Sequence, residues 1–142
     1  ALRMARIVAR GADLLLLHVV DVPFEGLLSY AGVPEEQIES YRIEARRKAL
    51  REMHALATRA GLVTGDYTTR VIVGEPSLQV LDQANLEARD LVVMGKHGTH
   101  VTEELLPGSV PKRVLDQTAA DMLVVVDERP PPSPGYGTGR SA

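Results

Sequence analysis

Three glycines and a serine in the second half of the chain have the types and spacing needed to bind a phosphate. Gly95 and Gly98 follow the apolar run Leu91–Met94, and Gly108-Ser109 comes after nine further residues. Glycine lets the backbone approach a ligand closely, and a serine at a helix start can donate from its hydroxyl and its N–H. The unpaired N–H groups and dipole of a helix N-terminus also favour an anion. This spacing therefore predicts a phosphate-binding loop between a strand and a helix.

Alternating strand and helix patterns flank this loop. Apolar runs predict strands at residues 12–21, 66–73, 90–94 and 122–126. Apolar residues three and four apart predict helices at residues 1–10, 35–60, 77–88 and 110–118. Residues 22–34 contain two prolines and two glycines and are predicted to form a loop. The predicted fold class is α/β, an open parallel sheet with helices on both faces, which binds ligands beyond the carboxyl ends of its strands.

Composition limits the classes of function. The 142 residues are 44% hydrophobic and 25% charged, which suits one domain with a proper core. A net charge of −3 argues against a nucleic-acid partner, and apolar runs of only a few residues argue against a membrane span. The chain has no cysteine, so disulfides and thiolate metal sites are excluded, and no histidine pair shows metal-ligand spacing.

The spacing Gly95-x2-Gly98-x9-Gly108-Ser109 resembles the nucleotide-binding signature of the universal stress protein family, in its ATP-binding branch. The segments LLLLHVVD, VIVGEP and SVPKRVLDQTAADMLVVV resemble further strands and helices of the family in the same order. The resemblance implies a Rossmann-like domain of the adenine nucleotide alpha hydrolase-like type over residues 1–128. Residues 129–142 would form a tail, rich in proline and glycine, that is too poor in apolar residues to fold alone.

The resemblance also assigns roles to particular residues. Val19 would contact the adenine, and Met94 and Gly95 would line the base and the ribose. The residues that would surround the phosphates are Gly98, Gly108, Ser109 and Val110. Taken singly, the glycines could form a plain turn and the serine a plain cap, but as a set they favour nucleotide binding.

Three nearby residues remain open to two interpretations. Lys96 and His97 could neutralise a phosphate, or they could be loop residues without a role. Asp21 could help to hold a magnesium ion through water, although a strand-end cap is the interpretation that we favour.

One part of the family pattern has no counterpart here. Family members begin with a central strand that carries an aspartate, whereas this chain opens in the predicted helix at residues 1–10. We therefore expect this sequence to lack the central strand, either because it is truncated or because residues before Ala1 are absent. Its two neighbours would keep unpaired backbone groups, each costing about 1–3 kcal/mol if buried. The nucleoside-binding aspartate is assigned to no residue of this sequence.

The expected protein is a cytoplasmic sensor or regulator of the stress response that binds ATP or a related adenine nucleotide. We expect a homodimer formed through the last strand, Met122 to Val126, because an open strand edge invites pairing. Enzymatic activity is left open and would be at most slow ATP hydrolysis, since no general base is evident beside the phosphates. The alternative is a dimeric interaction module of the same fold that binds no nucleotide. Pro111, which removes an N–H donor from the helix start, and the missing aspartate favour that alternative.

Overall fold

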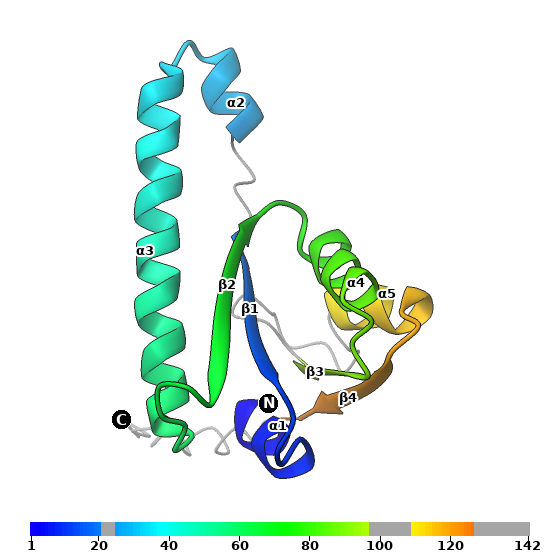
Figure 1. The fold of residues 1–142 in the computed structure, drawn as a ribbon. Helices are drawn as coiled ribbons and strands as arrows, with labels where there is room; N and C mark the ends of the chain where they lie inside the picture. The colour runs from blue at the N-terminus through cyan, green and yellow to red at the C-terminus, as the bar shows by residue number, and fades with distance from the viewer. Residues whose placement is uncertain (21–24, 97–108, 127–142) are drawn as a thin grey trace, which may run out of the picture.

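The computed structural model describes residues 1–20, 25–96 and 109–126 of the chain (Figure 1). Strands and helices alternate along these residues, as the sequence predicts. In chain order the elements are α1 (Leu2–Val8), β1 (Leu14–Val20), α2 (Glu25–Tyr30), α3 (Glu35–Arg59), β2 (Tyr67–Val73), α4 (Pro76–Leu86), β3 (Leu91–Gly95), α5 (Ser109–Gln117) and β4 (Asp121–Val125). Within these ranges no helix is both long enough and apolar enough to cross a membrane.

The predicted loop at residues 22–34 is wrong in part, because α2 forms inside it. Pro34 follows this helix rather than interrupting it, so its effect on the backbone falls between α2 and α3. Gly32 adopts a φ of 79°, which favours glycine, directly after the helix, and its N–H donates to the Ser29 carbonyl at 3.2 Å. The turn signals therefore mark the end of a short helix.

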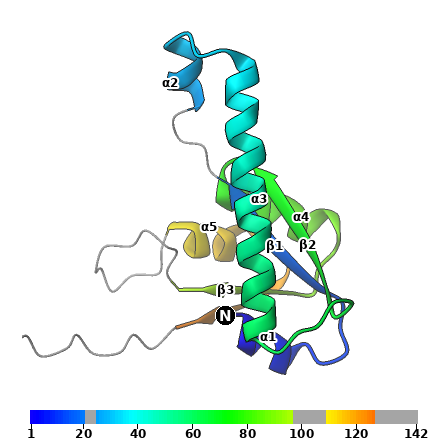
Figure 2. The same cartoon turned by 90° about the vertical axis from the view of Figure 1, so that its left-hand side faces the viewer.

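The strands form two separate parallel pairs. β1 pairs with β2 over seven residues, from Leu14 opposite Tyr67 to the last residues of both strands, and β3 pairs with β4 over five. In the part of the chain that the structure describes, no strand joins β1 to β3. This division agrees with the expectation that the central strand is missing. The two pairs also run in clearly different directions (Figure 2).

Helices cover both sides of the strands, as predicted. α3 contacts β1 and β2, whereas α4 and α5 contact each other and α4 also contacts β1. Figure 1 shows α3 on one side of the β1–β2 pair and α4 and α5 on the other. α1 contacts β3, so it reaches the second strand pair from the start of the chain. The architecture is therefore the predicted α/β arrangement with a division in its sheet.

The buried stripe of α3 differs in part from the predicted one. Ala49, Met53 and Ala57 are buried at steps of four residues, which places them on one face of the helix. The apolar spacing that predicts a helix at residues 35–60 also includes Tyr41 and Leu56, but these are 54% and 48% exposed. The first half of α3 extends beyond the strands, where α2 is the element that contacts it (Figure 1). A helix that extends past the sheet has only part of its apolar stripe covered.

Candidate functional site

The candidate residues that belong to strands lie at carboxyl ends, where the fold class predicts a ligand. Val19 is the second-last residue of β1, and Met94 and Gly95 are the last two residues of β3. All three are half-buried. The backbone N–H of Lys96 donates to the Val125 carbonyl at 2.8 Å, so pairing with β4 continues one residue past β3. Because β1 and β3 belong to different strand pairs, these residues come from both sides of the division.

The candidate residues on α5 lie in its first turn. Ser109 is exposed and is the first residue of the helix, rather than the cap that precedes it, so the helix starts one residue earlier than predicted. Pro111 is the third residue and is buried, which confirms that the proline lies in the first turn. Val114 is fully buried and anchors the helix one turn further on. The backbone N–H groups of the first turn have no partner within a helix, so this donor set fits an anion.

The structure describes both ends of the predicted glycine loop, Gly95 and Ser109, but not the loop between them. Gly98, Gly108 and His97 lie outside the described residues, and so does Asp21 beyond the end of β1. The cradle that these residues would form around a triphosphate therefore stays a prediction. Residues 127–142, which include the predicted tail, also lie outside the described residues.

A polar network joins the start of α4 to α5. Ser77 is 1% exposed, and its hydroxyl lies 2.7 Å from both carboxylate oxygens of Glu75, to which it donates. Glu75 caps α4 by accepting from the Leu78 N–H at 2.8 Å. From α5, Arg113 Nη1 donates to Ser77 Oγ at 3.2 Å and lies 3.5 Å from the Glu75 carboxylate. The network holds the two helices together one turn beyond the start of α5.

Hydrogen bonds to this carboxylate shift its titration. The Ser77 hydroxyl and then the Leu78 N–H lower the pKa of Glu75 below its ordinary value, and the Arg113 charge adds to the effect. Donors of this kind stabilise the ionised form. Sequence reasoning placed the start of a helix at Ser77 but missed Arg113, because that arginine is 36 residues from Ser77. An arginine one turn into a helix carries no local sign of its distant partner.

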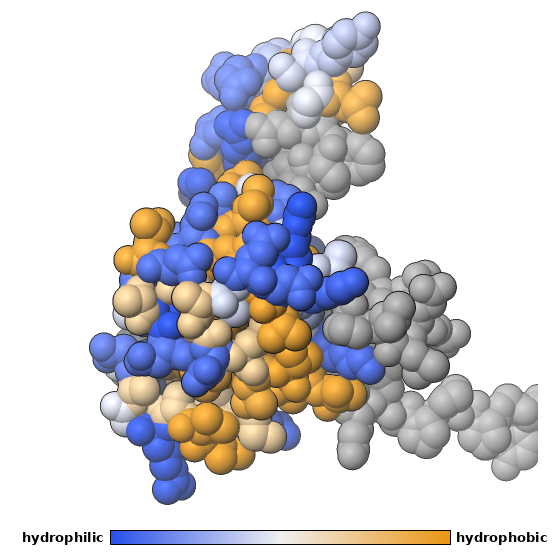
Figure 3. All heavy atoms as spheres, turned by 90° about the vertical axis from the view of Figure 1, so that its right-hand side faces the viewer, coloured by the Kyte–Doolittle hydropathy of each residue, from blue (hydrophilic) through white to orange (hydrophobic). Residues whose placement is uncertain are grey.

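The outer surface of α4 and α5 mixes apolar and charged side chains. Leu78 and Leu86 on α4 are 51% and 79% exposed, and Leu115 on α5 is 58% exposed. Figure 3 shows apolar and charged side chains interspersed over this side of the molecule. Across the described ranges, no group of three or more histidine, aspartate or glutamate residues is placed to hold a metal ion. Among the candidate residues from the sequence, the described features that fit a nucleotide are the strand ends and the start of α5.

Comparisons with known proteins agree with this arrangement. A model of the universal stress protein family matches residues 1–126. Universal stress protein MJ0531 of Methanocaldococcus jannaschii is 31% identical over 115 residues, which are 80% of this chain but only 65% of that protein. Universal stress protein MJ0577 of the same organism is 28% identical over 127 residues, which cover 82% of this chain and 78% of that protein.

Solved structures match as well. The structure of MJ0577 has a TM-score of 0.66 at 22% identity and covers 91% of this chain and 88% of that one, which shows a shared fold. A universal stress protein in complex with cAMP has a TM-score of 0.53 at 26% identity, over 87% of this chain and 78% of that one. The likeness to solved structures extends over most of the chain.

Proposed function

The chain belongs to the universal stress protein family, and on this premise we propose that it binds ATP or a related adenine nucleotide. It would act in the cytoplasm as a sensor or regulator of the stress response. The observation that carries the proposal is that β3 ends at Gly95 and α5 begins at an exposed Ser109. These are the two ends of the glycine segment that resembles the family's nucleotide signature. The relative solved with cAMP supports an adenine ligand.

Each candidate residue would make a contact suited to its chemistry. Val19 and Met94 offer apolar side chains for the adenine, and Gly95 leaves room for the ribose. Ser109 and Val110 would donate to the phosphates from the first turn of α5. Gly98 and Gly108 would complete the phosphate cradle, and a magnesium ion could accompany the nucleotide. Any hydrolysis would be slow, since the sequence shows no general base beside the phosphates.

Thermal unfolding with and without ATP tests this proposal. We expect millimolar ATP to raise the Tm of the wild-type protein, because a ligand that binds only the folded state stabilises it. Ser109→Ala removes a hydroxyl donor to a charged group and should weaken ATP binding by roughly tenfold. Ser40→Ala is the matched control, because Ser40 is an exposed serine on α3.

Two results would count against nucleotide binding. A wild-type Tm that millimolar ATP leaves unchanged would favour the interaction module that binds no nucleotide. An equal loss of affinity for ATP in Ser109→Ala and Ser40→Ala would show that the start of α5 is not part of the site. Mass analysis of small molecules released from denatured, purified protein gives an independent answer, because a bound adenine nucleotide would appear there directly.

We also propose that the protein forms a homodimer through β4, with the segment Met122 to Val126 at the interface. β4 pairs with β3 on one edge, and within the described residues its other edge has no strand partner. Val126, directly after β4, is 61% exposed. An uncovered strand edge invites pairing with another chain. Light scattering should give the mass of two chains, and the mass of one chain across a dilution series would contradict this proposal.

A further inference from the structure

Four arginines surround a hollow between α1 and the end of α3. The hollow has a volume of about 520 Å³ and is lined by Arg3, Arg6, Ile7, Arg10, Arg59, Ala60 and Gly61. Arg3 and Arg6 are three residues apart on α1, which places them on one side of the helix, and Arg10 follows the end of the helix. None of the described residues that line the hollow is acidic, although the chain as a whole has a net charge of −3. The hollow therefore brings four positive charges together.

One of these guanidinium groups is fixed by the backbone of the opposite helix. Arg6 Nη1 donates to the Ala60 carbonyl, at the end of α3, over 2.8 Å. The next residue, Gly61, has a φ of 76°, and a Cβ added there would lie 2.6 Å from the same nitrogen. A glycine at this position therefore both ends α3 and leaves space for the Arg6 side chain. One wall of the hollow therefore carries a cation, the Arg6 guanidinium, in a fixed position.

The four charges have no acidic partner among the residues that the structure describes. Within the described ranges, none of the four arginines forms an ion pair, whereas the arginines that do so elsewhere are Arg42, Arg51, Arg70, Arg89 and Arg113. Arg6 and Arg59 lie in the last turns of their helices, where the helix dipole favours a cation. Arg3 lies in the first turn of α1, where the dipole disfavours one. Balancing helix dipoles therefore does not account for the whole cluster.

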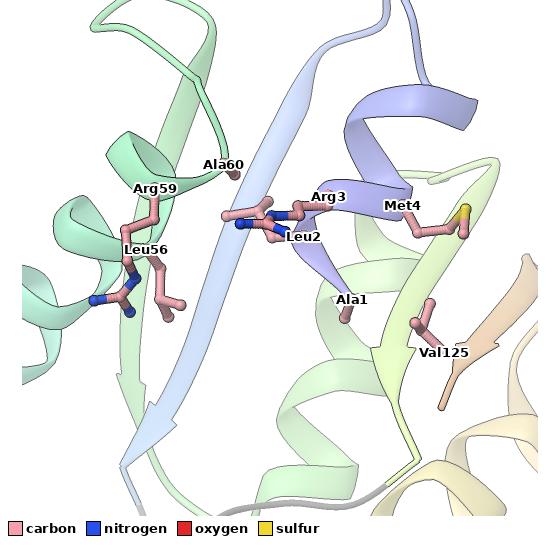
Figure 4. Close-up of a pocket in the computed structure, with 8 residues that line it drawn as sticks. All are labelled: Ala1, Leu2, Arg3, Met4, Leu56, Arg59, Ala60 and Val125. Atoms are coloured by element: carbon pink, nitrogen blue, oxygen red, sulfur yellow. The ribbon is translucent and has the colours of Figure 1, made fainter. Parts of the chain in front are cut away.

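We propose that this hollow binds a small polyanion of linked phosphate groups. Guanidinium groups form paired, charge-assisted hydrogen bonds to phosphate oxygens, and four of them around one hollow suit an anion of several charges. Figure 4 shows Arg3 and Arg59 coming from the two helices, beside a neighbouring pocket of about 390 Å³ that they also line.

The hollow lies away from the candidate nucleotide site. α1 leads into the start of β1 and α3 into the start of β2, so the arginines lie at the amino ends of these strands (Figure 1). Val19 lies near the opposite end of β1, and Ser109 begins α5. The proposal therefore stands or falls separately from nucleotide binding.

Calorimetric titration of the full chain with sodium tripolyphosphate tests the proposal. We expect saturable binding by the wild-type protein, weakened by roughly tenfold or more in the double variant Arg3→Gln/Arg10→Gln. This variant leaves the Arg6 contact with α3 in place, so it should fold, and its Tm without ligand checks this. The matched control is Arg46→Gln/Arg47→Gln, which removes the same charge from exposed positions on α3 that form no ion pair within the described residues.

Three results would overturn the proposal. Absence of saturable binding by the wild-type protein would do so. An equal loss of affinity in the control variant would show a general effect of net charge rather than a site. Binding that survives in Arg3→Gln/Arg10→Gln but disappears in Ser109→Ala would place the anion at the start of α5 instead. Binding that persists in Ser109→Ala, and is lost only with the hollow's arginines, supports the proposal whether or not ATP binds.

Discussion

The two strand pairs differ in length, in buried apolar residues and in candidate ligand contacts. β1 and β2 pair over seven residues and β3 and β4 over five. The buried apolar residues on or next to α1, β1 and α3 are Ala5, Val20, Ile38, Ala49, Met53, Ala57, Ala60 and Leu62. Those on α4 and α5 are Leu81, Ala84 and Val114, together with Pro111. The elements α1, β1 and α3 therefore contain most of the core that the structure describes.

The candidate ligand residues show the opposite distribution. Met94 and Gly95 belong to β3, and Ser109 and Val110 to α5, so only Val19 lies on the first pair. The comparison teaches that stability and binding are carried mainly by different parts of the fold, as is common where a binding site is built on a rigid scaffold. A nucleotide that contacts both Val19 and the end of β3 would connect the two pairs. Binding should then stabilise the arrangement of the pairs as well as each pair alone.

The largest expected effect on stability comes from truncating a buried side chain on each side of the division between the strand pairs. Met53→Ala, on α3, should lower the free energy of unfolding by about 2–5 kcal/mol, since it removes a buried side chain and leaves a cavity. Val114→Ala, on α5, removes less apolar volume and should cost about 2 kcal/mol. Urea unfolding measures both values, and amide hydrogen exchange shows which strands lose protection.

The pattern of exchange decides whether the comparison holds. We expect Met53→Ala to weaken protection in all four strands, and Val114→Ala to weaken it mainly in β3 and β4. If Val114→Ala exposes β1 and β2 to the same extent, the two pairs unfold as one unit and the distinction between scaffold and binding part is lost. Ala55→Gly on the exposed side of α3 is a control for helix propensity alone.

A smaller effect on stability should follow from replacing Glu75, the carboxylate that connects α4 to α5. The pKa of Glu75 is lowered in the folded protein from its ordinary value of 4.5, chiefly by the Ser77 hydroxyl. A group with a lowered folded pKa contributes stability above its ordinary pKa, and this contribution is lost as the pH falls through the lowered value. We therefore expect Glu75→Gln to reduce stability at neutral pH and to flatten part of the loss of stability below pH 4.5.

Urea unfolding across this acidic range measures the effect. Glu36→Gln serves as the comparison, because Glu36 is an exposed carboxylate in the first turn of α3 that makes no ion pair among the described residues. Identical pH profiles for Glu75→Gln and the wild-type protein would show that the network does not stabilise the folded state.

The sequence predicted elements better than it predicted contacts. Strand and helix periods are local, so β1, α3, β2, α4, β3 and β4 lie within a few residues of their expected ranges. The exposure of Tyr41 could not be read from the periodicity of α3, because it depends on how far the strands extend beneath that helix. Leu56, near the other end of α3, lines the pocket beside α1 instead. The contact between Arg113 and Ser77 joins helices that are distant in sequence, and residue patterns do not reveal such pairs.

For the candidate site, the sequence placed the strand and helix ends correctly. Gly95 ends β3 because an apolar run ends there, and Ser109 begins α5 because an apolar helical stripe starts after it. The roles given to Val19, Met94 and Val110 came from family resemblance, and they remain predictions. In the sequence, Arg3, Arg6 and Arg10 indicate only a helix whose arginines face water, because the hollow that they line depends on the end of α3 lying opposite them.

The divided sheet leaves two strand edges open within the described residues. The edge of β1 away from β2, and the edge of β3 away from β4, have no strand partner there. Rows of such backbone donors and acceptors act as templates for a further strand, and β1 consists largely of leucine and valine. A strand that paired with both edges would join the four described strands into one sheet, so the described arrangement contains the two places where such a strand would fit.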